Sequence, residues 1–132
     1  MHKGFLIAGT LFSFLSVVLG AFAAHALGEV LSLKLMATFE TGVRYQFYHA
    51  LALLFTAMIF KQLPVQAVKW AGRFFIAGIF LFSFSLYFLS VMKTLVVPGY
   101  KWFAIITPFG GVSFLCGWLL LFYAFIKHQK SL

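Results

Sequence analysis

Long apolar segments joined by short polar connections constrain the fold of this chain more than any other feature. The apolar runs cover residues 4–27, 41–60, 70–92 and 103–126. About 20 apolar residues in a helix cross a bilayer, so each run is long enough to span a membrane. Only 9% of the 132 residues are charged, against about 25% in a soluble domain. We therefore predict an all-α, integral membrane four-helix bundle that forms a single domain over residues 1–132.

The connections between the runs carry turn signals. Pro64 disfavours helical geometry at the residue before it, and the Pro98-Gly99 pair is typical of a turn. Residues 28–40 are mixed in polarity, but Leu31, Leu35 and Phe39 recur at the spacing of one helical face. This segment is predicted to be either an interfacial helix or an extension of the second span.

The ten basic residues lie mostly near the ends of the apolar runs, which is typical of interfacial anchors and not of a nucleic-acid stripe. The lipid bilayer is therefore the expected partner, and nucleic acid is not. If the spans alternate in direction, six basic residues fall on the side of the termini and four on the other, which predicts cytoplasmic termini. The first set is Lys3, Lys61, Lys69, Arg73, Lys127 and Lys130, and the second is Lys34, Arg44, Lys93 and Lys101.

The same alternation gathers the polar residues of the spans in one half of the bilayer, opposite the termini. An ionisable residue in a span costs about 2.5–3.5 kcal/mol on insertion scales, so it needs a partner or a purpose. We predict a polar pocket in this outer half, built in the core of the bundle. Its candidate ligand-binding residues are His25, Glu40, Thr41, Arg44, Tyr45, Gln46, Tyr48, His49, Ser83, Ser85, Tyr87 and Thr107.

Helical spacing within the second run suggests specific contacts. Glu40 lies four residues before Arg44, a spacing that suits an ion pair. His49 is the deepest member of the cluster, so we expect it to be neutral. We also expect it to bond a hydroxyl group of another span, with Ser83, Ser85 and Tyr87 as the candidates.

Three interpretations of the cluster stay open at this point. It could be a set of hydrogen bonds that join the helices, a ligand-binding or transport site, or a metal or haem site held by two histidines. Depth disfavours the last, since at 1.5 Å per residue His25 falls at the rim and His49 near the middle of the bundle. No metal site, cofactor or catalytic residue is predicted, because Glu29 and Glu40 are the only acids and no cofactor motif is present.

The favoured function is that of a small, non-enzymatic membrane protein that binds a small ligand, a lipid headgroup or a partner helix. The alternatives are a subunit of an oligomeric transporter or channel, and a haem or redox membrane protein. Four short spans are few for alternating access, so a transporter would have to assemble as a homo-oligomer or with a partner membrane protein. The sequence does not identify the ligand or the oligomeric state.

Four blocks of the chain resemble the signatures of a known family. Residues 20–27 resemble GAFGAHAL, residues 41–52 resemble a TG–YQ–YHALA block, and residues 81–87 resemble LFSGSLY. Residues 107–111, followed by Gly117-Trp118, resemble TPIGG…GW. In this order they are similar to the small inner-membrane protein family that has YgdD and YwdK members, and the resemblance covers essentially the whole chain.

The resemblance implies a four-span protein of the bacterial cytoplasmic (inner) membrane, and it implies no established activity. Two positions depart from the pattern, since Ala23 and Phe84 stand where glycine is usual. A phenylalanine at position 84 is expected to reduce close helix approach at that point.

Overall fold

The computed structural model describes residues 1–129, and all the regular secondary structure in this part of the chain is helical, with no strand. Lys130, one of the predicted anchors, lies outside the described residues. The prediction of an all-α membrane helical bundle is confirmed. The main helices are α1 (Lys3–His25), α2 (Leu33–Gln62), α3 (Gln66–Gly78), α4 (Ser85–Thr94) and α5 (Tyr100–His128), with a 3₁₀ turn η1 (Leu27–Glu29) and a π-helical segment η2 (Ile79–Phe84).

The segment between the first two apolar runs belongs mainly to α2. The hydroxyl of Ser32 accepts a hydrogen bond from the Leu35 N–H at 3.3 Å and so caps the start of the helix. From there α2 continues without a break to Gln62, just before Pro64. Of the two sequence-based alternatives, an extension of the second span is therefore found, and η1 is the one short turn that separates it from α1.

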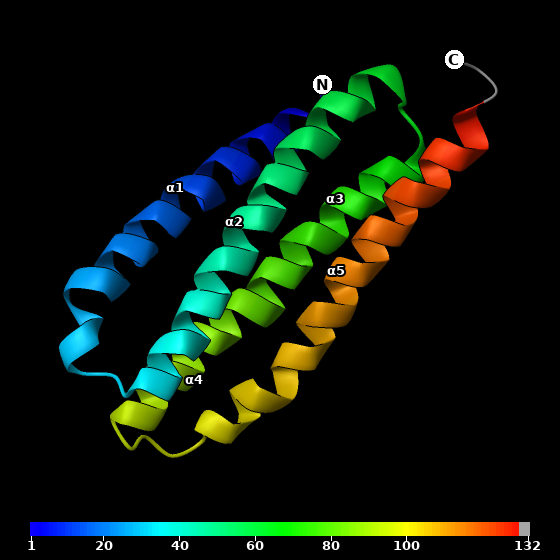
Figure 1. Cartoon of the computed structure of the whole chain (residues 1–132). Coiled ribbons are helices and arrows are strands. Elements are labelled where there is room, and N and C mark those ends of the chain that lie inside the picture. The colour runs from blue at the N-terminus through cyan, green and yellow to red at the C-terminus, as the bar shows by residue number, and fades with distance from the viewer. Residues whose placement is uncertain (130–132) are drawn as a thin grey trace.

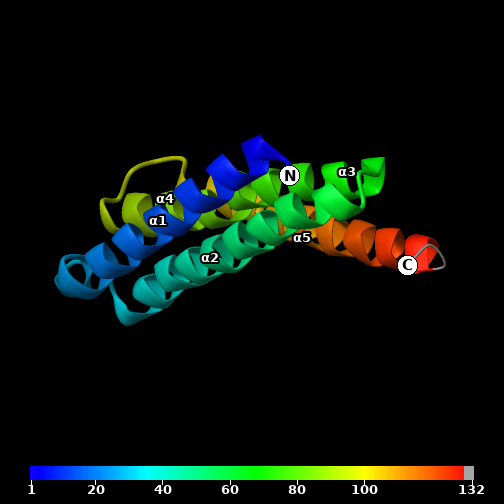
Figure 2. The ribbon, with the colours of Figure 1, turned by 90° about the horizontal axis from the view of Figure 1, so that it is seen from above.

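The helices run alternately up and down (Figure 1). The N-terminus and the last turns of α5 lie at the end of the bundle that holds the α2–α3 connection, called here the terminal end, and the α1–α2 and α4–α5 connections lie at the distal end. Figure 2 shows α1 and α2 side by side along their length. α2 also contacts α3, η2 and α4, and α5 covers the other side of these three segments. α1 and α5 are therefore the outer helices, with α2 and α3–η2–α4 between them.

The third apolar run is one helical stretch that contains a π-helical segment near its middle, which the sequence analysis did not predict. The opposing helix approaches the backbone of this segment closely at Gly110. A Cβ atom at Gly110 would lie 2.3 Å from the backbone nitrogen of Phe82 and 2.6 Å from the carbonyl carbon of Leu81. π-Helical turns are rare and often occur where packing or function demands them. Gly110 thus marks a close backbone approach between α5 and the third run.

Three helical stretches are long and apolar enough to cross a membrane: Lys3–His25, Gln66–Thr94 and Tyr100–His128. α2 is not among them, because Arg44, Gln46 and His49 dilute its apolar character. α2 nevertheless packs against α1 on one side and against the α3–η2–α4 stretch on the other. The span count of four stays a prediction that rests on α2.

The alternating arrangement gives a topology prediction. We expect a green fluorescent protein fused after residue 132 to fluoresce and an alkaline phosphatase fused there to be inactive, because the basic residues of the terminal end favour the cytoplasm. The control is a phosphatase fusion at Val97 in the distal α4–α5 turn, which we expect to be active. The reverse activity pattern would contradict cytoplasmic termini, and activity at both sites would contradict the presence of a membrane-spanning helix between them.

Candidate functional site

The structure divides the twelve predicted site residues into two groups. The interior group is buried or half-buried between helices, whereas the outer group is exposed or half-exposed on the surface of the bundle. The interior group consists of Gln46, His49, Ser83, Ser85, Tyr87 and Thr107, and the outer group of His25, Glu40, Thr41, Arg44, Tyr45 and Tyr48.

Gln46 joins three helices in the interior. Its side chain is completely buried. The amide Nε2 donates to the backbone carbonyl of Phe12 in α1 at 2.9 Å, and Oε1 accepts a hydrogen bond from the hydroxyl of Tyr87 in α4 at 2.8 Å. A buried amide must find such partners because an unpaired one is costly. Gln46 therefore holds α2 to both of its neighbours at one level of the bundle.

His49 makes the interhelical hydrogen bond that was predicted for it, but with a different partner. Its Nε2 lies 3.1 Å from Nε1 of Trp118 in α5, and its Nδ1 lies 2.7 Å from the carbonyl oxygen of Tyr45. The indole N–H can only donate, so Nε2 accepts and Nδ1 carries the proton. The imidazole is therefore a neutral ring in a single tautomer, and it stacks on Phe114 with ring centres 3.5 Å apart.

Trp118, which is 46% exposed, is the partner of His49 that the sequence reasoning missed. The expected partners of His49 were hydroxyl groups of the third span, whereas Trp118 lies in α5. The sequence feature that could have indicated Trp118 is the Gly117-Trp118 pair of the family signature. Gly117 lets α5 lie against Phe75 of α3, since a Cβ atom there would be 2.6 Å from the Phe75 ring.

The remaining interior hydroxyl groups form a small chain. The Ser85 and Thr107 hydroxyl oxygens are 2.7 Å apart and link α4 to α5. Each also lies near a carbonyl of its own helix stretch, that of Phe82 at 2.8 Å and that of Phe103 at 2.7 Å. The two hydroxyl groups have two protons for these three contacts, so neither proton is left to donate to a ligand. Ser83 differs, because its buried hydroxyl has no hydrogen-bond partner.

The interior group is thus engaged in holding helices together, with Ser83 as the exception. Its hydrogen bonds join α2 to α1, α2 to α4, α2 to α5 and α4 to α5. Polar side chains commonly join helices in membranes in this way. What remains accessible to a ligand is the outer group.

The predicted ion pair between Glu40 and Arg44 is absent, and that expectation was wrong. Both side chains are exposed. The guanidinium Nη2 of Arg44 instead donates to the hydroxyl of Thr41 at 3.2 Å. An exposed pair of charges gains little from association, since solvation competes with the attraction. Arg44 therefore keeps most of its five N–H donors available.

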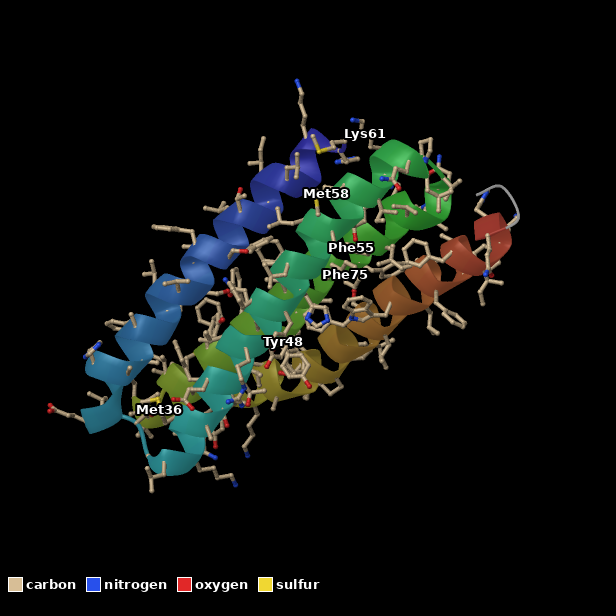
Figure 3. The ribbon with its side chains drawn as sticks, turned by 45° about the horizontal axis from the view of Figure 1, so that its top comes forward. Met36, Tyr48, Phe55, Met58, Lys61 and Phe75 are labelled. Atoms are coloured by element: carbon tan, nitrogen blue, oxygen red, sulfur yellow. The ribbon has the colours of Figure 1, made fainter. Side chains whose placement is uncertain are left out.

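Arg44 lies on the wall of a shallow groove between α1 and α2. The groove has a volume of about 200 Å³ and is largely open on its outer side. Tyr48, on the same wall, lies about halfway along α2 (Figure 3). Ser16 at the floor is buried, and its hydroxyl donates to the Phe12 carbonyl at 2.8 Å. The lining residues are Ser16, Val17, Val43, Arg44, Phe47 and Tyr48.

The histidines do not come together in a metal centre. His25 is exposed at the last residue of α1, whereas His49 is buried beside Trp118 and Phe114. Among residues 1–129, no group of three or more His, Cys, Asp or Glu side chains is placed to hold a metal ion.

The helices and the paired polar interior define the class of this molecule as an α-helical integral membrane protein. Residues 19–111 match the family described as protein of unknown function (DUF423). The chain belongs to this family, and the resemblance drawn from its four sequence blocks is confirmed.

Three relatives illustrate the match, and the chain covers nearly all of each. A UPF0382 membrane protein of Staphylococcus epidermidis is 41% identical over 125 residues, which is 95% of this chain and 97% of the relative. The UPF0382 membrane protein YwdK of Bacillus subtilis is 39% identical, over 96% and 98% of the two chains. The UPF0382 inner membrane protein YgdD of Escherichia coli is 36% identical, over 96% and 92%. No solved structure matches the chain.

Proposed function

We propose that this protein is a non-enzymatic protein of the bacterial cytoplasmic membrane that binds an anionic lipid headgroup in the groove between α1 and α2. The observation that carries the proposal is Arg44, an exposed guanidinium on an otherwise mostly apolar groove, whose one hydrogen-bond partner among residues 1–129 is the Thr41 hydroxyl.

The chemistry of the groove suits an anionic amphiphile. A guanidinium presents its donors in a planar fork that matches the oxygen atoms of a phosphate. Val17, Val43 and Phe47 supply the apolar lining beside it, against which an acyl chain can pack. The hydroxyl of Tyr48 belongs to the same lining and adds a polar contact. The groove thus offers a cation to the phosphate of a phospholipid and an apolar surface to its acyl chain.

The depth of Arg44 also suits a headgroup. A 30-residue helix is about 45 Å long and the hydrocarbon core about 30 Å thick, so α2 extends beyond the core and Arg44 lies within roughly 10 Å of its distal boundary. A long basic side chain at this depth extends toward the headgroups.

Other functional classes find less support in the geometry. Apart from Ser83, the interior polar side chains, which a transport path would have to use, are engaged in hydrogen bonds between helices. The two acids, Glu29 and Glu40, are exposed near the distal end and form no catalytic pair with each other inside the bundle. We therefore favour lipid binding over a transporter or channel subunit and over an enzyme.

The test is lipid binding by native mass spectrometry of the full chain in detergent. We expect Arg44→Gln to weaken binding of phosphatidylglycerol at this site about tenfold or more, because a hydrogen bond to a charged group contributes about 1.5–3 kcal/mol. Binding of zwitterionic phosphatidylcholine should change much less.

The matched control is Lys101→Gln, which removes an exposed charge at the distal end of α5 outside the groove. We expect it to retain binding, and Arg44→Lys to lose part of it, since lysine keeps the charge but not the fork. The free energy of unfolding should be similar for all three variants. Equal phosphatidylglycerol binding by Arg44→Gln and Lys101→Gln would overturn the proposal.

A further inference from the structure

A second groove lies at the terminal end, between the end of α2 and the last turns of α5. Its volume is about 410 Å³, within the usual range of ligand pockets. Phe122, Phe125 and Ile126 of α5 form one wall, and Leu63 lies opposite at the end of α2. His128 and Gln129 complete the lining where the groove reaches the end of the helix. The groove is therefore apolar along its length and polar at its outer end.

The charges of the bundle are segregated around this groove. The terminal end carries five basic side chains within the described residues, whereas both acids of the chain, Glu29 and Glu40, lie toward the distal end. Lys61 is in the last turn of α2 and Lys127 in the last turn of α5, so each of the two helix ends beside the groove carries a cation, although neither lysine lines the groove. The five basic residues are Lys3, Lys61, Lys69, Arg73 and Lys127.

Aromatic rings hold two of these cations at the level of a membrane interface. The Nζ of Lys127 lies 5.5 Å from the centre of the Tyr123 ring, and the guanidinium carbon of Arg73 lies 4.7 Å from that of Trp70. Tyrosine and tryptophan collect where headgroups meet hydrocarbon. The mouth of the groove is thus at headgroup depth, and its walls reach into the acyl-chain region. Figure 3 shows Lys61 at this end of α2.

We propose that this groove holds an acyl chain of an anionic glycerophospholipid of the bilayer, whose phosphate is attracted to this end of the bundle by its basic residues, Lys61 and Lys127 among them. The apolar walls select a hydrocarbon chain, and the excess of cations without nearby acids selects a negative headgroup. This site goes beyond the proposed function, because it lies at the opposite end of the bundle from the Arg44 groove and faces the other leaflet.

The charge requirement is tested with the full chain in detergent and native mass spectrometry. The double variant Lys61→Gln/Lys127→Gln should bind phosphatidylglycerol about 25-fold more weakly at this site, since each interfacial basic residue contributes about fivefold. Phosphatidylcholine binding should change little. The control pair Lys93→Gln/Lys101→Gln removes two exposed distal charges. A loss as large in the control pair, or no loss in the test pair, would overturn the proposal.

The groove itself is tested by filling it. Ile126→Trp adds an indole to a lining residue, and Ile105→Trp is the control on the same helix, with 55% exposure against 57% for Ile126. We expect Ile126→Trp to reduce the number of tightly bound phosphatidylglycerol molecules by one, and Ile105→Trp to leave it unchanged. Equal numbers of bound lipid molecules in both variants would contradict the presence of a lipid acyl chain in the groove.

The two lipid sites can be separated by stoichiometry. In an Arg44→Gln background, the lipid at the terminal end should still be retained and should still be lost on Ile126→Trp. If lipid binding at Arg44 is not found, the proposal for the groove at the terminal end can still hold. If the groove at the terminal end binds no lipid, the proposal for Arg44 can still hold. If Ile126→Trp instead shifts the protein between monomer and dimer without changing its lipid count, the groove is an interface between copies of the chain and the lipid proposal is wrong.

Discussion

Replacing Gly110 with alanine is expected to lower the free energy of unfolding by about 2–3 kcal/mol, as overpacking of a tight contact does. The added methyl carbon would lie 2.3 Å from the backbone nitrogen of Phe82. Backbone atoms cannot rotate out of the way as a side-chain end can. α5 would have to move away from the π-helical segment, which would strain the Ser85–Thr107 contact between α4 and α5.

Gly111 provides the control within the same turn. A methyl group there would meet only the ring of Phe82 at 3.9 Å, an ordinary contact. Gly111→Ala should be neutral or stabilising by up to about 1 kcal/mol, because alanine favours helix over glycine. Both variants can be unfolded in mixed micelles by titration with dodecyl sulfate and followed by circular dichroism. Equal losses would show that the contact at Gly110 does not determine the packing.

Gln46→Leu is expected to cost about 1–3 kcal/mol, because it leaves the buried hydroxyl of Tyr87 without an acceptor. The Phe12 carbonyl suffers less, since it keeps the hydrogen bond from the Ser16 hydroxyl. The same titration measures the loss. Thr41→Leu, a change of similar kind at a half-exposed position of the same helix, should cost less.

A double-mutant cycle with Tyr87→Phe tests the cause. Tyr87→Phe removes the hydroxyl, so adding Gln46→Leu to it no longer leaves an unpaired group on α4. The double variant should therefore be more stable than the sum of the two single losses predicts, by about 0.5–2 kcal/mol. Strict additivity would mean that the 2.8 Å contact between Gln46 and Tyr87 contributes nothing measurable.

The sequence grouped the polar residues in one cluster, whereas the structure divides them between the interior and the surface of the bundle. Thr41, Tyr45 and His49 recur every four residues and so share one face of the second run, yet His49 is buried and Tyr45 is 40% exposed. Spacing says which residues share a face, but not which face meets a neighbour. The Glu40–Arg44 pair failed for the same reason, since both side chains point outward where solvation weakens the attraction.

The π-helical segment could not be predicted from the third run by itself. Residues 79–84 are apolar or hydroxylated like the rest of that run, and nothing in them breaks a helix. What distinguishes the segment is the approach of Gly110, which lies 26 residues or more away in the sequence. The sequence shows the Gly110-Gly111 pair, but it does not show that Gly110 packs against the backbone at Phe82.

The sequence by itself determined that this protein is an all-helical membrane protein and to which family it belongs. The reason is that long uncharged runs satisfy their backbone polar groups in hydrocarbon only as helices or closed barrels, and a run of about 20 residues has the length of a helix that spans the bilayer. The tertiary structure decided the rest. Whether a polar side chain becomes a helix-joining bond, as with His49 and Trp118, or an exposed binding group, as with Arg44, depends on how each helix is rotated and shifted against its neighbours. That geometry is set by contacts between distant residues, such as Gly110 with Phe82 and Gly42 with Tyr87, where the absence of a side chain on one helix admits another.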